Sequence, residues 1–288
     1  MVAIIIPACN EEALIERTIG CLLANEESDR LDVIVCCNGC SDRTALLASR
    51  MSGPIRVLEM TVGSKTAAFN MGDAVAVSHP RIYLDADITL SETAIQSITQ
   101  ALKDPRILAV APRMLVDVTG RNWFIRAFYD VWLRTPYHED GMIGSGVYAL
   151  SEAGRARFGK FPNIIADDAF VRAQFDPHER RVLNDCYFTV RTPTTIGSLL
   201  KIKTRAALGN MELAAKYPAL VARNQSNDRR HRRWGMLRMA LQPRLWPKLC
   251  VYGFVKLVAR VRANSQWNTL NAYRWERDDS SRVPAANL

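Results

Sequence analysis

Short apolar runs alternate with longer amphipathic segments through the first 110 residues of the chain. The runs are rich in Val and Ile and lie at residues 2–6, 32–36, 55–60, 81–85 and 107–111, with helical patterns at 11–24, 43–51, 64–78 and 91–103. A strand followed by a helix about every 25 residues is typical of parallel strands joined by right-handed crossovers. Strands without polar positions are expected where helices cover both faces of the sheet. The pattern therefore predicts an α/β fold with a mostly parallel sheet and flanking helices.

The rhythm changes after residue 111. The pattern there predicts helices at 121–137, 151–158, 166–175 and 195–215, and strands at 142–150 and 181–191. The segment 216–277 has the composition of two or three basic helices, and proline interrupts it near Pro243 and Pro247. We therefore expect a binding and catalytic domain over residues 1–215 and a basic helical extension with a tail over residues 216–288.

Composition and charge set the broad class of protein. With 48% apolar and 23% charged residues among 288, the chain can bury a sizeable core, and disorder, collagen and coiled coil are poor fits. The charge is unevenly placed. Residues 216–277 hold 14 Lys or Arg and two acids, a balance of +12, which leaves −3 for the rest of a chain whose total is +9. A basic region on a mildly acidic body indicates an interaction surface.

The cysteines and the apolar runs indicate a cytoplasmic protein. The first residues lack a basic region and become polar after Pro7, unlike a signal peptide. No apolar run reaches the roughly 18 residues of a membrane-spanning helix. Seven cysteines, an odd number, fit reduced thiols. Cys37 and Cys40 have CxxC spacing, but no second Cys or His pair accompanies them, so zinc is disfavoured and a redox role is a minor alternative.

Polar residues follow four consecutive predicted strands. In chain order they are Pro7, Ala8, Asn10 and Glu11, then Asn38 and Asp42, then Lys65, and then Asp85, Ala86 and Asp87. Ligands of an open parallel sheet bind in the crevice beyond the carboxyl ends of its strands, so these side chains should share one site. Each group alone is weak evidence, but four in order on one edge favour a nucleotide and metal site.

The sequence lacks the common phosphate-binding loops. No GxGxxG follows the first strand, and the segment 63–66 lacks the spacing of a Walker A loop. Another source of positive charge must then neutralise phosphates. Asp85 and Asp87 point the same way from an extended segment, and their hard oxygens suit Mg²⁺ or Mn²⁺. The alternative is that both only cap the helix that begins near Ser91.

Asp167 and Asp168 form a second acidic pair. They follow an apolar stretch and open a predicted helix. One interpretation is a favourable acidic helix N-terminus, worth a few tenths of a kcal/mol. The other is a carboxylate directed into the crevice as a general base.

Together these motifs resemble those of the family 2 glycosyltransferases, which have the GT-A fold. The matching segments are IIIPACNEE, VIVCCNGCSDRT, GSKTAAFNMG, YLDADI, GSGVYAL and IADDAFV, within roughly residues 2–210. Members of this family are inverting enzymes that transfer a sugar from a nucleotide diphosphate, usually UDP, to an acceptor hydroxyl. The resemblance implies a Rossmann-like GT-A fold and a hexosyltransferase that depends on Mg²⁺ or Mn²⁺.

The resemblance also implies roles for single residues. The nucleotide sugar would contact Pro7, Ala8, Asn10, Glu11, Asn38, Asp42, Lys65, Asp85, Ala86 and Arg205. Among these, Asn38 would meet the base and Asp42 would support its loop. Asp85 would face ribose or sugar, and Asp87 would ligate the metal. Asp168, the second acid of the family's Glu-Asp pair, would be the catalytic base.

The chain departs from the family pattern in several places. Asn38 stands where Asp is commonest, which puts base recognition in doubt, and Asp167 replaces the usual Glu. Of the Gln-x-x-Arg-Trp motif of processive members only Arg205 remains, which argues for one sugar per encounter. Arg205 would neutralise the leaving diphosphate, and the alternative is that it belongs to a solvated basic helix face.

Two further features carry less weight. The glycines Gly144 and Gly146 would bring backbone close to the donor or acceptor. His178, ten residues beyond Asp168, is a weak candidate for a further metal ligand, and a surface position is favoured.

The basic C-terminal region mixes charge with Trp and Leu. Its cations include Arg229, Arg230, Arg232, Arg233, Arg238, Arg244, Lys248, Lys256, Arg260 and Arg262. Basic helices with Trp and Leu suit the face of an anionic membrane. We therefore expect peripheral association with the inner face of the cell membrane and a lipid-linked saccharide acceptor. The tail at 275–282 also resembles those of bacterial cell-envelope and exopolysaccharide transferases. The alternative is that these helices pack on the body or on a second subunit.

Two rival functions remain at this point. A sugar-nucleotide pyrophosphorylase would use a related sheet, but it should carry a loop rich in Gly and Arg after the first strand. A nucleic-acid-binding protein would explain the basic region, but it leaves the strand-end residues unexplained, and the sequence holds no recognised nucleic-acid motif. We therefore expect a nucleotide sugar, and not nucleic acid, as the ligand.

Overall fold

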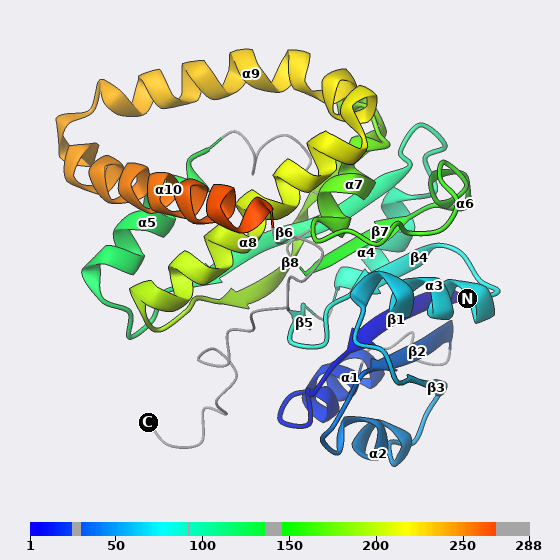
Figure 1. The fold of residues 1–288 in the computed structure, drawn as a ribbon. Helices are drawn as coiled ribbons and strands as arrows, with labels where there is room; N and C mark the ends of the chain where they lie inside the picture. Colours follow the sequence, from blue (N-terminus) through cyan, green and yellow to red (C-terminus); the bar gives the residue numbers. More distant parts are fainter. Residues whose placement is uncertain (25–29, 92, 136–145, 269–288) are drawn as a thin grey trace.

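An eight-stranded curled sheet with helices on both faces forms the centre of the protein (Figure 1). The computed structural model describes residues 1–24, 30–91, 93–135 and 146–268, and of residues 224–234 it describes only the backbone. The strands are β1 (Val2–Ala8), β2 (Leu31–Asn38), β3 (Ile55–Met60), β4 (Arg81–Leu84), β5 (Thr89–Leu90), β6 (Ala109–Asp117), β7 (Val147–Leu150) and β8 (Arg180–Arg191).

The strand order is β3-β2-β1-β4-β7-β6-β8-β5. Strands β1 to β4, β6 and β8 run in one direction, and only β7 and the short β5 run against them. The prediction of a mostly parallel α/β sheet is confirmed. Because β1 to β4 run in the same direction, the residues that follow them collect at one edge of the sheet.

Helices flank this sheet and form the C-terminal region of the protein. In chain order they are α1 (Ile15–Leu23), α2 (Thr44–Ser49), α3 (Lys65–Val75), α4 (Ala94–Ala101), α5 (Trp123–Leu133), α6 (Glu152–Arg155), α7 (Asp167–Ala173), α8 (Ile196–Lys216), α9 (Pro218–Ala240) and α10 (Trp246–Trp267). Short 3₁₀ turns lie at Pro177–Glu179 and Pro243–Leu245.

Two apolar layers hold the sheet between the helices. Ile4 and Ile6 of β1 belong to the layer under α1, α2 and α4, whereas Ile5 between them belongs to the layer under α3 and α7. This is the two-residue alternation of a strand, and here both sides are apolar because both faces are covered. Phe69 of α3 and Phe170 of α7 fill the second layer. The layer brings α3 and α7, which begin at Lys65 and Asp167, onto the same face.

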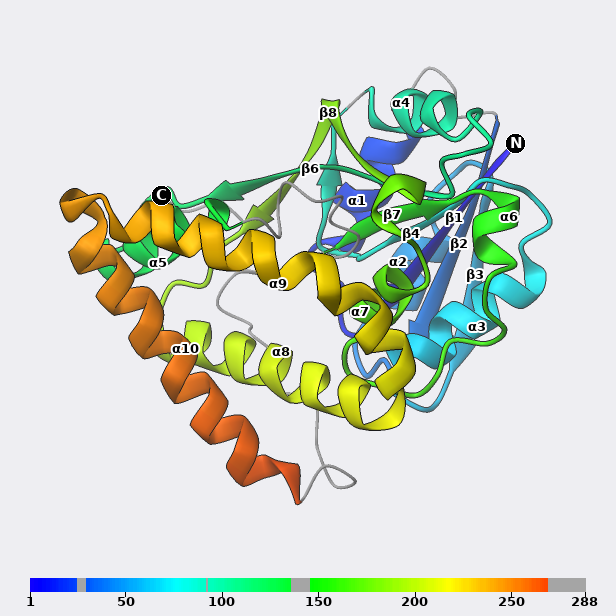
Figure 2. The ribbon, with the colours of Figure 1, turned by 90° about the horizontal axis from the view of Figure 1, so that it is seen from above.

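The C-terminal helices form a second packed group with α5 (Figure 2). The rings of Phe128 on α5 and Tyr252 on α10 stack at 5.2 Å, and Lys248 of α10 binds Asp130 of α5 at 2.6 Å. Lys203 of α8 lies over the ring of Trp132 at 4.2 Å. Burial, with smaller effects of Lys256 and Arg205, lowers the pKa of Lys203 to about 7. The helical character predicted for 216–277 is confirmed as far as residue 268. The division at residue 215 stays a prediction.

Two local expectations need correction. Asn10 followed by two glutamates resembles a helix start, but α1 begins only at Ile15. Asn10 instead has φ of 52° and turns the chain, because its side chain binds Ser41. The sequence also gave no sign of β5, which pairs with β8 through only two residues. Over the described part of the chain, no helix is both long enough and apolar enough to cross a membrane.

Candidate active site

The loops after β1 and β2 are tied together by hydrogen bonds. Asn10 Oδ1 accepts from the Ser41 backbone at 2.7 Å, and its Nδ2 donates to Ser41 Oγ at 3.1 Å. Asp42 accepts from the backbone N–H groups of Glu12 at 3.1 Å and Thr44 at 3.0 Å. Asn10 and Asp42 thus fix the conformation of these two loops.

Asn38, the last residue of β2, is hydrogen-bonded through its side chain to β1. It is buried, and its Nδ2 donates to the carbonyls of Ala8 at 3.0 Å and Cys36 at 3.3 Å. An Asp at this position has no N–H to give, so its carboxylate would meet two carbonyl oxygens. Asn therefore fits this position better than the commoner Asp.

Lys65 joins two of the predicted acidic groups. Its Nζ lies 2.8 Å from Asp85 Oδ1 and 3.4 Å from Asp167 Oδ2. Asp85 comes from the end of β4, Lys65 from the first turn of α3 and Asp167 from the first turn of α7. The strand-end residues and the second acidic pair, which are 82 residues apart in sequence, therefore meet at one ammonium group.

Burial and charge set the protonation of this cluster. Burial raises the pKa of Asp167 to about 6; the Lys65 ammonium opposes this rise, and Asp168 and Asp85 add to it. Burial also disfavours the charged form of Lys65, but Asp167 and Asp85 outweigh it and hold the pKa of the ammonium above its ordinary value. Lys65 is thus a fixed positive charge between carboxylates.

Asp168 lies beside this cluster. Its Oδ1 accepts from the N–H of Ala169 at 2.7 Å, and its side chain is half-buried. Tyr148 of β7 is 3% exposed, and its hydroxyl has no hydrogen-bond partner within the described residues. Burial raises the pKa of Tyr148, and the carboxylates of Asp167, Asp168 and Asp85 contribute. Asp85, Asp167 and Asp168 are therefore all close enough to Tyr148 to disfavour its charged form.

Helix α8 fixes the turn that presents Asp167 and Asp168. Glu212, which is 4% exposed, accepts from the backbone N–H of Ile165 at 2.8 Å. Lys216 bridges Glu212 at 2.7 Å and the Asn163 carbonyl at 3.3 Å. Gly209 lets α8 approach closely, because a Cβ there would lie 3.0 Å from the backbone nitrogen of Ala166. We call Gly209, Glu212 and Lys216 the α8 clamp.

We expect Gly209→Ala to lower turnover by about tenfold, because small displacements of reacting groups cost that much or more. The added methyl group would push the segment that leads into Asp167 and Asp168. Steady-state kinetics would show the effect in kcat more than in KM. Gly197→Ala on the same helix is the matched control, since its Cβ would meet only Thr195 Oγ1 at 3.8 Å. Equal turnover of the two variants would show that the α8 clamp does not position Asp167 and Asp168 for the reaction.

Asp87, the second candidate metal ligand, lies in different surroundings from Asp85. Asp85 contacts Lys65, whereas Asp87 lines a small cavity together with Arg17 and Arg191. Over the described residues, no three His, Cys, Asp or Glu side chains converge closely enough to hold an ion by themselves. Mg²⁺ and Mn²⁺ need few protein ligands, since these ions keep several waters and take further oxygens from phosphates.

Gly146 packs against the turn that carries these aspartates. Its carbonyl accepts from the Asp85 N–H at 2.7 Å. It has φ of 124°, and a Cβ on it would lie 2.6 Å from Ile88. Glycine is therefore required at this position. Gly144 lies outside the described residues.

The remaining candidate residues of the nucleotide site are buried or lie on α8. Pro7, Ala8 and Ala86 are buried, so they can shape the site chiefly through backbone. Glu11 is also buried. Arg205 lies one helical turn before Gly209, on the side of α8 that faces the Asp167 turn.

Two weaker candidates lie away from this site. His178 is exposed in the turn before β8, at the opposite edge of the sheet. The seven cysteines are free thiols, and burial, together with Cys40, raises the pKa of Cys37 to about 12. That disfavours the thiolate that redox chemistry of the CxxC pair would need.

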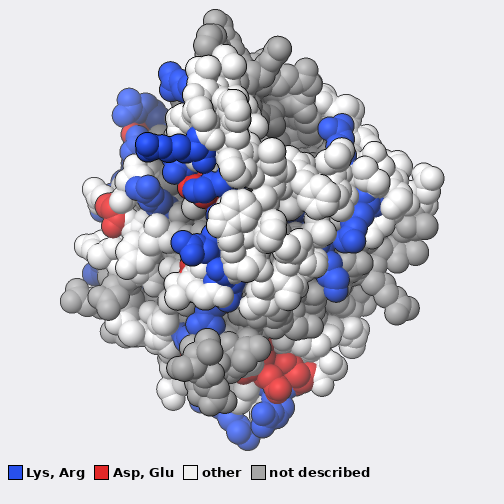
Figure 3. All heavy atoms as spheres, turned by 90° about the vertical axis from the view of Figure 1, so that its left-hand side faces the viewer, with Lys and Arg blue, Asp and Glu red and all other residues white. Residues whose placement is uncertain are grey.

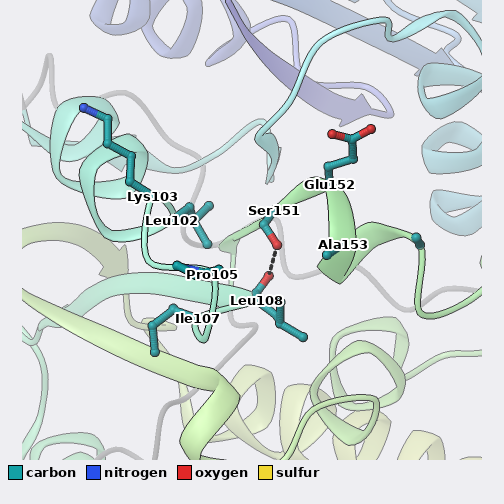
Figure 4. Close-up of a pocket in the computed structure, with 9 residues that line it drawn as sticks. Leu102, Lys103, Pro105, Ile107, Leu108, Ser151, Glu152 and Ala153 are labelled. Carbon is teal, nitrogen blue, oxygen red and sulfur yellow. Dashed lines mark hydrogen bonds between the residues drawn. The ribbon is translucent and has the colours of Figure 1, made fainter.

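A larger cavity of about 470 Å³ lies at the same opposite edge (Figure 4). Its walls come from Leu102, Lys103, Pro105, Ile107, Leu108, Ser151, Glu152, Ala153 and Ala156. Ser151 Oγ donates to the Leu108 carbonyl within it at 3.4 Å. None of the strand-end candidates lines this cavity, so the chemistry of the sequence motifs lies elsewhere.

Comparison with known proteins decides the family. The sequence matches the family Glycosyl transferase family 2 over residues 3–160, which is more than half of the chain. The chain belongs to glycosyltransferase family 2. The matched region of this transferase holds Lys65, Asp85 and Asp87, and it ends before Asp167 and the α8 clamp. No curated protein matches the sequence.

Solved structures of transferases share the fold. A mannosyltransferase from Pyrobaculum calidifontis, solved with GDP-Man and Mn²⁺, has a TM-score of 0.61 and 19% identity, over 96% of this chain and 76% of that one. S. aureus TarS 1–349 with UDP has a TM-score of 0.53 and 12% identity, over 97% and 94%. TarS has also been solved with UDP-GlcNAc. These similarities confirm the GT-A fold, and the family match sets aside both rival functions.

Proposed function

We propose that the protein transfers a hexosyl group from a UDP-sugar to an acceptor hydroxyl with inversion at the anomeric carbon. The observation that carries the proposal is the bridge from Asp85 through Lys65 to Asp167, since it joins the donor side of the site to the acid next to Asp168. Structural neighbours solved with UDP, UDP-GlcNAc and GDP-Man support a nucleotide-sugar donor.

Asp168 acts as the base in this proposal. It accepts the proton of the acceptor hydroxyl while that oxygen attacks the anomeric carbon and the bond to the diphosphate breaks. A single displacement inverts the centre, so an α-linked donor gives a β-linked product. Lys65 provides a fixed positive charge beside the donor, and Arg205 neutralises charge on the departing diphosphate.

Asp85 and Asp87 are the residues that would hold Mg²⁺ or Mn²⁺. When bound, such an ion neutralises the developing charge on the diphosphate. The Mn²⁺ in the mannosyltransferase structure supports a divalent ion in this transferase. Because Lys65 already pairs with Asp85, the protein itself compensates part of the carboxylate charge before a donor arrives.

The acceptor in this proposal is a lipid-linked saccharide of polysaccharide biosynthesis, elongated by one sugar per encounter. The enzyme would work in the cytoplasm, at the inner face of the cell membrane. The loss of all but Arg205 from the processive motif supports single addition. The basic helices after residue 216 support a membrane-bound acceptor.

A thermal-shift screen tests the donor and the ion together. We expect a UDP-sugar with Mn²⁺ to raise the Tm, since a ligand at a hundred times its Kd adds about 2.7 kcal/mol of stability. The same screen includes GDP- and dTDP-sugars. Asp87→Ala should lose most of the Mn²⁺-dependent part, and Asp185→Ala, on the exposed side of β8, serves as its control. A donor shift that is equal with and without Mn²⁺ would contradict the metal role.

A further inference from the structure

Helix α10 carries an apolar stripe that faces away from the rest of the protein. Trp246, Phe254, Leu257 and Val261 are 58%, 61%, 63% and 60% exposed. Their spacing of three, four or eight residues places them on one side of the helix. A separate side of α10 holds its buried residues and packs on α5 and α8. The exposed stripe is therefore not needed to hold α10 in place.

The end of α9, next in space to the start of α10, also carries exposed leucines. Leu237 and Leu241 there are 51% and 74% exposed. The indole Nε1 of Trp246 donates to the carbonyl of Ala240 at 2.9 Å, which ties the start of α10 to the end of α9. We call Leu237, Leu241, Trp246, Phe254, Leu257 and Val261 the α9–α10 surface.

The segment that carries this surface has charge of one sign. Residues 235–268 contain six Lys or Arg and no Asp or Glu. Arg238, Arg244, Lys256, Arg260 and Arg262 are exposed among them. On the side of the molecule where α9 and α10 meet, Figure 3 shows uncharged atoms in the middle and Lys and Arg on both flanks, with fewer Asp and Glu atoms at the left and near the bottom. Apolar side chains with cationic margins complement a surface that is apolar inside and anionic outside.

Two other occupants fit the charge pattern less well. In a symmetric dimer the same surface meets itself, so the basic margins of both copies would lie together with no acid from 235–268 between them. A nucleic acid would match the cations but would leave the Trp, Phe and Leu side chains facing phosphates and solvent. An anionic lipid bilayer satisfies both the apolar stripe and its margins.

We propose that the α9–α10 surface docks on an anionic bilayer, with Phe254 and Leu257 entering the interface and Arg260 and Arg262 at the headgroups. The inference deepens the proposed function, whose acceptor lies in a membrane. Its test uses no nucleotide sugar, so docking and glycosyl transfer can fail separately.

Vesicle sedimentation of the full chain tests the docking. We expect binding to vesicles of phosphatidylcholine with phosphatidylglycerol to exceed binding to phosphatidylcholine alone by about tenfold or more, and to weaken in raised salt. Leu257→Glu combined with Phe254→Glu should lower binding to anionic vesicles by about tenfold. The matched control is Val77→Glu, which changes another apolar side chain, 84% exposed, at a distant position.

Several outcomes would overturn the proposal. Equal binding of the double variant and the wild type would show that the stripe does not insert. Equal binding to neutral and anionic vesicles would remove the role of the cations. Analytical ultracentrifugation and a DNA titration identify the other occupants. A wild-type dimer that Leu257→Glu dissociates, or tight DNA binding without vesicle binding, would assign this surface to a second copy or to nucleic acid.

Discussion

Asp168→Asn should lower turnover by about a thousandfold, because a positioned general base contributes roughly 10² to 10⁴ to rate. Asn has nearly the same shape as Asp and cannot accept the proton of the acceptor hydroxyl. In the proposed mechanism Asp168 contacts the acceptor hydroxyl and not the nucleotide, so donor affinity should change little. Kinetics with a UDP-sugar, together with nucleotide titration by calorimetry, would measure both quantities on the same protein.

Asp167→Asn is the informative comparison for this prediction. Asp167 is buried and bound to Lys65, so its change should affect stability and donor binding as well as rate. Asp185→Asn, an exposed carboxylate on β8, should leave turnover unchanged. If Asp168→Asn retained near-normal turnover while Asp167→Asn lost it, the base would be Asp167.

Lys65→Met should destabilise the fold and weaken donor binding together. Removing one partner of a buried ion pair costs about 3 kcal/mol or more, since the other charge stays buried without compensation. The Asp167 side chain, 7% exposed, would then face Asp85 and Asp168 without the ammonium between them. Chemical denaturation gives the free energy of unfolding, and donor affinity should fall by about tenfold or more in the same variant.

The defect of Lys65→Met should depend on pH with a definite sign. The folded-state pKa of Asp167, about 6, is already above its ordinary value, and loss of Lys65 would raise it further. A raised carboxyl pKa means that the folded state takes up a proton as pH falls, so the variant should regain stability relative to the wild type as pH falls toward about 6, where the wild-type Asp167 also becomes protonated. Lys65→Arg, which keeps the charge, should behave more like the wild type. A Lys65→Met protein as stable as the wild type at pH 8 would contradict the role of the bridge.

The sequence carried enough information for the sheet and the order of the motifs. Residues 2–6 and 33–36 are apolar at every position, which is the pattern expected of a strand covered on both faces. Because such strands are parallel, the position of Asp85 near Lys65 followed from the topology without knowledge of any contact. The composition of residues 216–277 predicted two or three basic helices, and the structure has helices over the part of this segment that it describes.

Contacts between distant segments could not be predicted in this way. Glu212 and Lys216 read as an ordinary helical i,i+4 pair, and only the fold shows that they hold the turn before Asp167. The glycine at position 209, inside a predicted helix, indicates close packing, but the sequence does not identify the segment that packs against it. The cationic neighbours of Asp87, Arg17 and Arg191, come from α1 and β8, and nothing local to Asp87 indicates them.

The most direct measurement is a crystal structure of the protein with Mn²⁺ and a UDP-sugar, with the ion located by anomalous scattering. We expect an ion bound by Asp87, alone or with Asp85, between the protein and the diphosphate. We also expect the anomeric carbon of the sugar to face Asp168. An ion or nucleotide bound elsewhere, or Asp168 directed away from the sugar, would contradict the proposed mechanism.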